Sequence, residues 1–234
     1  MTTPSGSRGP DPAATPSSVA EAVAVQEELR SRVDLVGPGP SAPATVAGLD
    51  VAYAESGDLL AAAVTVLDTR TLEVVDRAVS VGRPAFAYVP GLFAFRELPA
   101  LLAALDRLAT RPELLVCDGH GLAHPRRFGL ACHLGVVTDL PSIGVGKTPL
   151  VGVWTPPQAE RGAWSPLRDG DEVVGRVLRT RSGVKPVFVS VGHRVSLDNA
   201  VAQVLALTPR HRLPETTRTA DRPCRDALAT ATRR

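Results

Sequence analysis

A carboxylate ends a short apolar segment near the middle of the chain, and basic residues follow it closely. Residues 114–117 read Leu-Leu-Val-Cys, Asp118 comes next, and two histidines and the pair Arg126-Arg127 follow within nine residues. The apolar run is typical of a buried strand, and in α/β proteins ligands bind beyond the carboxyl ends of strands. A carboxylate beside cations there suits metal-assisted phosphate chemistry. Because Asp and Gly are also common turn residues, a plain structural turn at Asp118 stays open.

The composition is that of one globular domain. The chain has 234 residues, of which 44% are hydrophobic and 21% charged, which is enough to bury a substantial core. Residues 1–16 are rich in Pro, Ser, Gly, Thr and Ala, so we expect a disordered leader there and a single domain over 17–234. No apolar run approaches the ~18–20 residues that span a bilayer, and the N-terminus lacks the apolar core of a secretory signal. We therefore expect no membrane attachment.

Cysteine usage and charge limit the setting and the partners. Cys117, Cys132 and Cys224 are far apart and include no Cys-x-x-Cys pair, which disfavours a disulfide framework or a zinc ribbon and favours the cytoplasm. From residue 209 onward there are seven Arg against three acidic residues. This basic tail suits a polyanionic partner, but a solvated surface explains it equally well.

Hydrophobic periodicity predicts a mixed α/β fold. Strands are predicted at Thr45–Tyr53, Leu60–Leu67 and Glu73–Val81, joined by tight turns as an antiparallel meander. Helices are predicted over 18–32, 91–108, 126–138 and 196–207, and further strands at 114–118, 142–145, 172–181 and 186–191. Three antiparallel strands followed by alternating helices and strands indicate a mixed sheet, in which parallel strands follow the three antiparallel ones and helices flank the sheet.

Three acidic residues fall at positions where such a sheet could bring them together. Asp50 lies in the first predicted strand, Glu97 in the second predicted helix, and Asp118 ends the fourth strand. Each alone has a structural explanation: a strand-end turn, an exposed helix face or a cap. Together they could converge on one end of the sheet, where carboxylates and water suit Mg²⁺.

Several longer motifs resemble the endonuclease V family of inosine-directed endonucleases. They are Gly48-Leu-Asp-Val-Ala-Tyr53, Tyr88-Val-Pro-Gly-Leu-Phe-Ala-Phe-Arg-Glu-Leu-Pro99 and Asp118-Gly-His-Gly-Leu-Ala-His-Pro-Arg-Arg127. The segments 143–147, 192–196 and 212–221 continue the resemblance in the family's order. The match extends from about residue 18 to 222.

The resemblance implies an RNase H-like fold and a Mg²⁺-dependent nuclease, with Mn²⁺ as a substitute. It implies recognition of deoxyinosine in single- or double-stranded DNA and hydrolysis of the second phosphodiester bond 3′ to the lesion, to begin DNA repair. Asp50 and Asp118 match the metal-binding positions, and Glu97 is the third catalytic acid. Tyr88 matches the family's aromatic wedge, which fills the space left by an extruded base.

Further residues follow from the same resemblance. Lys147 matches a catalytic lysine whose ammonium would stabilise charge at the scissile phosphate. Supporting roles fall on Pro90, Gly91, Arg96, His124, His133, Gly144 and Asp221. Asp221 is expected either to complete the outer shell of the metal or to cap the final helix. Gly146 stands where the family often has Ala, which would either loosen the strand end or give the base pocket more room.

Other functions are weighed against this one. Gly144-Val-Gly-Lys-Thr148 imitates the end of a Walker A motif, but residue 141 is Pro where that motif requires Gly. His120 and His124 have zinc-like spacing, yet Pro125 disfavours the helix they would need, so we expect satisfied loop histidines. Inosine-specific cleavage of RNA and a non-catalytic nucleic-acid-binding module stay open as alternatives. We expect a monomer.

Overall fold

Eight strands form one mixed sheet across the part of the chain that the computed structural model describes, residues 13–233. The predicted leader, residues 1–16, lies mostly outside this range. The strands are β1 (Thr45–Tyr53), β2 (Leu60–Asp68), β3 (Val74–Gly82), β4 (Leu114–Cys117), β5 (Ser142–Gly146), β6 (Trp164–Asp169), β7 (Glu172–Leu178) and β8 (Val187–His193). The helices are α1 (Val19–Arg30), α2 (Phe93–Leu105), α3 (Leu130–Thr138), α4 (Leu197–Ala206) and α5 (Glu215–Ala231).

The strand order is β3-β2-β1-β4-β5-β8-β7-β6. The first three strands are antiparallel, and β4 and β5 then run parallel to β1, as the sequence predicts. From β5 onward the pairing is antiparallel again. The predicted RNase H-like arrangement, three antiparallel strands followed by parallel ones, is therefore confirmed.

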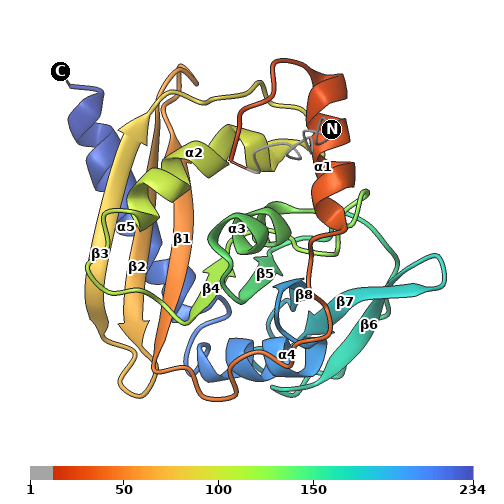
Figure 1. Cartoon of the computed structure of the whole chain (residues 1–234). Helices are drawn as coiled ribbons and strands as arrows, with labels where there is room; N and C mark the ends of the chain where they lie inside the picture. Colours follow the sequence, from red (N-terminus) through yellow and green to blue (C-terminus); the bar gives the residue numbers. More distant parts are fainter. Residues whose placement is uncertain (1–12, 234) are drawn as a thin grey trace, which may run out of the picture.

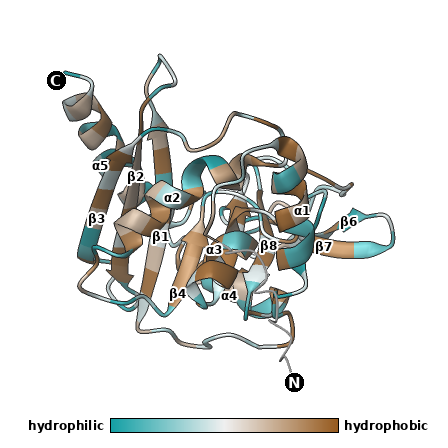
Figure 2. Ribbon diagram, turned by 45° about the horizontal axis from the view of Figure 1, so that its top comes forward, coloured by the Kyte–Doolittle hydropathy of each residue, from teal (hydrophilic) through white to brown (hydrophobic). Residues whose placement is uncertain are grey.

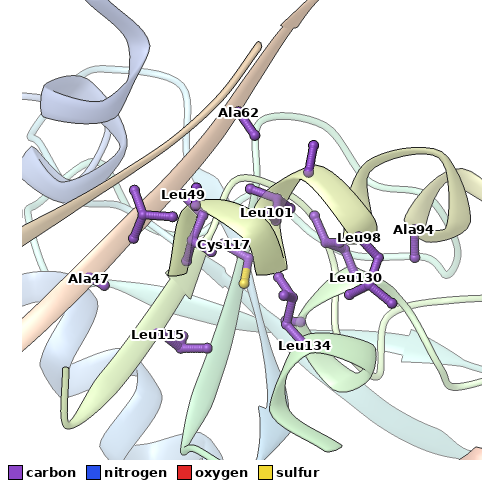
Figure 3. Close-up of a cluster of buried hydrophobic side chains, with 14 of the residues drawn as sticks. Ala47, Leu49, Ala62, Ala94, Leu98, Leu101, Leu115, Cys117, Leu130 and Leu134 are labelled. Carbon is purple, nitrogen blue, oxygen red and sulfur yellow. The ribbon is translucent and has the colours of Figure 1, made fainter. Parts of the chain in front are cut away.

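Helices cover both faces of the sheet, with α2 in front of β1–β3 and α5 behind them (Figure 1). Leu98 and Leu101 of α2 pack with Leu49 and Cys117 of the sheet and with Leu134 of α3 (Figure 3). Hydrophobic residues run along the central strands, whereas the outer end of the β6–β7 hairpin is hydrophilic (Figure 2). No described helix is both long and apolar enough to cross a membrane.

Local backbone geometry explains where helices start. Ser18 caps α1 as predicted, because its hydroxyl accepts from the backbone N–H of Glu21 at 3.2 Å. The helix predicted from residue 91 begins at Phe93, since Gly91 has φ +78°. The helix predicted from residue 126 begins at Leu130, because Arg127 has a left-handed backbone with φ +55°.

Two elements lie outside the predicted strand and helix ranges. Strand β6 is partly exposed and contains Pro166, which weakens a strand pattern. Helix α5 contains Pro223, and Leu228 is the one large apolar residue on its buried side, which otherwise consists of Thr216, Thr217, Ala220 and Cys224. Contact with β1 and β2 holds this helix, although the sequence indicates only a basic segment.

Candidate active site

The register of β1 and β4 brings two predicted acids together. Leu49 pairs with Cys117 in parallel register, so the next residues on the two strands, Asp50 and Asp118, are neighbours. Neighbouring strands lie about 4.8 Å apart, and residues in register point to the same face. Both carboxylates are partly buried, and their mutual repulsion is felt in the protonation of Asp50. The sheet therefore creates a concentrated negative charge at this point.

Asp50 protonates more easily than an ordinary aspartate. Burial raises its pKa from 3.8 to about 6, and the charge of Asp118 adds to the rise. Lys147 and Arg225 oppose the shift but do not cancel it. A nearby cation would offset both causes, because it favours the ionised form.

Glu97 reaches the same region from α2. It is 5% exposed, so the exposed-helix-face alternative for this residue is wrong. Its Oε1 accepts a hydrogen bond from the hydroxyl of Tyr53 at 2.9 Å. Burial raises the pKa of Glu97 to about 8, and the charges of Asp50 and Asp118 act in the same direction. The three predicted acids therefore interact electrostatically.

Lys147 follows β5 directly and contacts Asp118. Strands β4 and β5 pair in parallel, with Cys117 opposite Gly144. Residues just beyond the carboxyl ends of these strands therefore share one edge of the sheet. The Nζ of Lys147 donates to Oδ2 of Asp118 at 2.6 Å. Asp118 therefore forms an ion pair just beyond the end of β4, a contact that a residue with only a turn-forming role would not need.

Two adjoining cavities meet at this edge. One, of about 560 Å³, is lined by the acids Asp50, Glu97 and Asp118. The other, of about 370 Å³, is lined by Asp118, Lys147 and several loop residues, including Pro90 and Gly91. Residues that line both are Tyr88, Phe93, Asp118 and Leu130. The acidic region is thus continuous with a less acidic space of ligand size.

Tyr88 lies on the loop before α2, at the boundary between these two cavities. It is 68% exposed, so Tyr88 is not an aromatic residue of the core. The ring meets Phe93 edge-on, with 6.3 Å between ring centroids. An exposed aromatic ring at the rim of a cavity is available for contact with a ligand.

The carbonyl of Gly91 anchors the Tyr88 loop. It accepts hydrogen bonds from Gln26 Nε2 at 3.0 Å, His124 Nε2 at 2.9 Å and Arg126 Nη2 at 2.6 Å. His124 Nδ1 accepts from the backbone N–H of Arg126, so Nε2 carries the proton. Burial lowers the pKa of His124 to about 4, which keeps it neutral. In the structure His124 and Gly91 thus hold the Tyr88 loop in place, and their supporting role in a reaction stays a prediction.

Of the other predicted supporting residues, Arg96 lines a cavity, whereas Gly144 and His133 do not. Arg96 lines the acidic cavity, where its guanidinium lies 4.8 Å from the centroid of the Tyr53 ring and donates to the carbonyl of Phe86 at 2.9 Å. Gly144 allows close approach of the loop after β4, because a Cβ there would lie 2.6 Å from the Gly121 nitrogen. His133 is fully buried and packs with Phe95, at 5.0 Å between ring centroids. His133 lines neither cavity.

Asp221 lies in the second turn of α5 and forms an ion pair with Arg225. The capping alternative is wrong, because the N-cap of this helix is Pro214. Arg225 lowers the pKa of Asp50 electrostatically, and Cys224 donates to the Asp50 carbonyl at 2.9 Å. This part of α5 therefore packs against β1 at Asp50, although no α5 residue lines the acidic cavity.

The expectation of satisfied loop histidines holds for His124 and in part for His120, whose ring makes a hydrogen bond to the backbone of Thr148. His120 lines the smaller cavity, and its buried Nδ1 has no hydrogen-bond partner within the described residues. Its ring occupies the space beside Gly146, where a Cβ would lie 2.3 Å from Cε1. The room left by Gly146 is thus filled by this ring.

Tyr53 and Gln26 contact site residues, although neither is predicted from the sequence as a site residue. Tyr53 appears in a matched motif, but its contact with Glu97 joins residues 44 positions apart. Gln26 lies in α1 and is fully buried. A buried glutamine in an amphipathic helix is the one local signal, because such a group needs partners.

The donor set fits a hard divalent cation. Between residues 13 and 233 no three His, Cys, Asp or Glu side chains are arranged to hold a metal ion together. Mg²⁺ commonly binds through one or two carboxylates and keeps several waters, so the pair Asp50 and Asp118 is sufficient. The raised pKa of Asp50 indicates a local deficit of positive charge that such an ion would correct.

Comparison with known proteins agrees with this geometry. The family model described as Endonuclease V matches residues 27–222. The chain is 60% identical over 223 residues to Endonuclease V of Streptomyces avermitilis, covering 94% of this chain and 97% of that protein. A crystal structure of Endonuclease V from that organism superposes with a TM-score of 0.91 at 59% identity, covering 94% and 97% of the two chains.

A more distant solved structure holds nucleic acid. Endonuclease V of Ciona intestinalis, in complex with a 24mer DNA containing an inosine followed by a ribo-adenosine, superposes with a TM-score of 0.78 at 27% identity. The alignment covers 91% of this chain and 98% of that one. With the family model matching most of its length and close relatives along nearly all of it, the chain belongs to the endonuclease V family.

Proposed function

We propose that this protein is a Mg²⁺-dependent endonuclease that recognises deoxyinosine in DNA and hydrolyses the second phosphodiester bond 3′ to the lesion. Endonuclease V enzymes cleave DNA near deoxyinosine, and the family is generally metal-dependent. One observation carries the proposal. The neighbouring acids Asp50 and Asp118 lie beside Lys147, where an acidic cavity adjoins a second cavity of ligand size.

Each acid and the lysine have a chemical role in this proposal. Asp50 and Asp118 would hold Mg²⁺ or Mn²⁺, and Glu97 is the third acid of the site. The bound ion supplies charge neutralisation at the phosphate and an acidified water. The ammonium of Lys147, freed in part from Asp118 when a cation binds there, stabilises the charge that develops on the phosphate.

The second cavity suits a base taken out of the stack. Removing a base from the duplex costs a few kcal/mol, least for a mispaired one. Tyr88 is exposed at the boundary of both cavities, where its ring can fill the space that the base leaves. The complex of the Ciona relative with inosine-containing DNA supports this assignment.

The cellular setting follows from the chain itself. All three cysteines are free and buried, which supports a reducing compartment, and we place the enzyme in the cytoplasm. Residues 17–234 would act as one catalytic domain and as a monomer.

A nicking assay tests the proposal. Oligonucleotides of one sequence, with inosine or adenine in DNA or RNA, are incubated with the protein with and without Mg²⁺. Cleavage of inosine DNA only with the metal, at the second bond 3′ to inosine, is expected. The variant Asp118→Asn should bind this DNA and fail to cut it, whereas the control Asp106→Asn, which lines neither cavity, should cut normally. Preferential cleavage of inosine RNA would favour the RNA alternative, and full activity of Asp118→Asn would refute the metal assignment.

A further inference from the structure

Three backbone carbonyls lie at the point where the β5–β8 ladder ends, and one side chain binds all of them. The last pair of this ladder joins Gly146 to Phe188. Just beyond it, Arg212 Nη2 donates to the carbonyls of Lys147 and Pro186, both at 2.8 Å, and its Nε donates to the carbonyl of Lys185 at 2.9 Å. The guanidinium of Arg212 therefore links the two segments just beyond the last backbone pair of β5 and β8.

The same contacts connect Arg212 to the acidic site. Lys147 is held at its backbone by Arg212 and at its ammonium by Asp118, with Nζ 2.6 Å from Oδ2. Arg212 itself is fixed, because its carbonyl accepts from the hydroxyl of Thr180 at 2.7 Å. Without the clamp, the residues after β5 would lose their attachment to the start of β8.

We propose that Arg212 is a positioning residue that fixes the backbone of Lys147 so that its ammonium faces the scissile phosphate. This inference rests on the proposed function, in which Lys147 stabilises charge at that phosphate. Arg212 acts through Lys147 and does not touch the substrate.

The geometry requires arginine at this position. A planar guanidinium offers several N–H donors in a fixed fork, so it can bind carbonyls from two segments at once. A lysine offers a compact ammonium on a flexible stem and cannot reproduce that fork. Arg212→Lys should therefore keep the charge and lose the clamp.

A double-mutant cycle with Lys147 tests the proposal. Single-turnover cleavage of inosine DNA is measured at saturating protein and Mg²⁺ for wild type, Arg212→Lys, Arg212→Ala, Lys147→Ala and the double variant Arg212→Ala with Lys147→Ala. We expect each Arg212 variant to cut on the order of tenfold to a hundredfold more slowly, because a misplacement of about 1 Å can cost up to about a hundredfold in rate. In the Lys147→Ala background the Arg212 change should have no further effect, because nothing remains to be positioned.

Arg179 provides the matched control. It also clamps three carbonyls, those of Pro157, Gln158 and Val184, but contacts none of the site residues. Arg179→Ala should lower the melting temperature about as much as Arg212→Ala and leave cleavage at the wild-type rate. Added guanidinium should restore part of the activity of Arg212→Ala, which a globally unfolded variant would not permit.

These outcomes distinguish a failure of the proposed function from a failure of the positioning role of Arg212. A wild-type protein that never nicks inosine DNA contradicts the proposed function. If the wild-type protein is active but the rate reductions of the Arg212→Ala and Lys147→Ala variants multiply in the double variant, only the positioning role is contradicted. Slow cleavage by Arg179→Ala in proportion to its lost stability would likewise overturn that role, because the effect would then be structural.

Discussion

The buried acid Glu97 makes the stability of the metal-free protein depend on pH. Its pKa is raised from 4.5 to about 8, chiefly by burial. Between these values the folded state holds a proton that the unfolded state has released. The stabilising contribution is therefore complete below pH 4.5 and is lost as the pH rises through about 8. The slope in this window approaches about 1.4 kcal/mol per pH unit.

Glu97→Gln should remove this slope. The amide has the same shape, keeps an oxygen that accepts from the Tyr53 hydroxyl, and carries no titratable proton. Between about pH 6 and 8 the wild-type free energy of unfolding should fall by a few kcal/mol, whereas that of the variant should stay nearly level. Below about pH 6 both proteins keep a slope from Asp50, whose pKa is raised from 3.8 to about 6.

Urea denaturation in EDTA at several pH values provides the measurement. The control is Glu27→Gln on the exposed side of α1, which should follow the wild-type profile. Adding Mg²⁺ should flatten the wild-type profile, because a cation at Asp50 and Asp118 favours the ionised acids. Parallel profiles for wild type and Glu97→Gln in EDTA would refute the reasoning that burial keeps this acid protonated.

Three further substitutions probe the cavities. Tyr88→Ala should reduce the preference for inosine over adenine in DNA roughly tenfold, since stacking on an aromatic ring is worth about 1–3 kcal/mol; unchanged selectivity in competition nicking would make Tyr88 structural. Gly91→Ala should lower the free energy of unfolding by about 1–2 kcal/mol in urea titrations, because φ is +78° and the new Cβ would lie 2.8 Å from Arg126. Gly146→Ala should displace His120, whose Cε1 would be 2.3 Å away, and weaken inosine-DNA binding in anisotropy titrations; equal affinity would show that the ring position is unimportant.

The sequence by itself determined the first three strands, of which β1 carries Asp50. The predicted strand Thr45–Tyr53 coincides with β1, and the second and third predicted strands differ from β2 and β3 by one residue at each differing end. Their patterns are local, since alternation and turn residues lie within a few positions of one another. The motifs around Asp50, Glu97 and Asp118 are likewise stretches of consecutive residues, so they indicate the family without the tertiary structure.

Tertiary packing decided what these local patterns cannot contain. Helix α5 has a polar sequence with an internal Pro223 and is held by its contact with β1 and β2. The contact of Tyr53 with Glu97 spans 44 residues, and that of Arg212 with Lys147 spans 65. A hydrogen bond between distant residues leaves no periodic signal along the chain.

The electrostatics of the site also belong to the tertiary structure. The residue type of Glu97 is visible in the sequence, but burial of its side chain and the charges of Asp50 on β1 and Asp118 beyond β4 decide whether it keeps its proton. Desolvation depends on everything packed around a group, so it cannot be assigned from one residue's neighbours in sequence. The sequence supplied the chemical groups, and the packed sheet and helices decided their charge and their orientation.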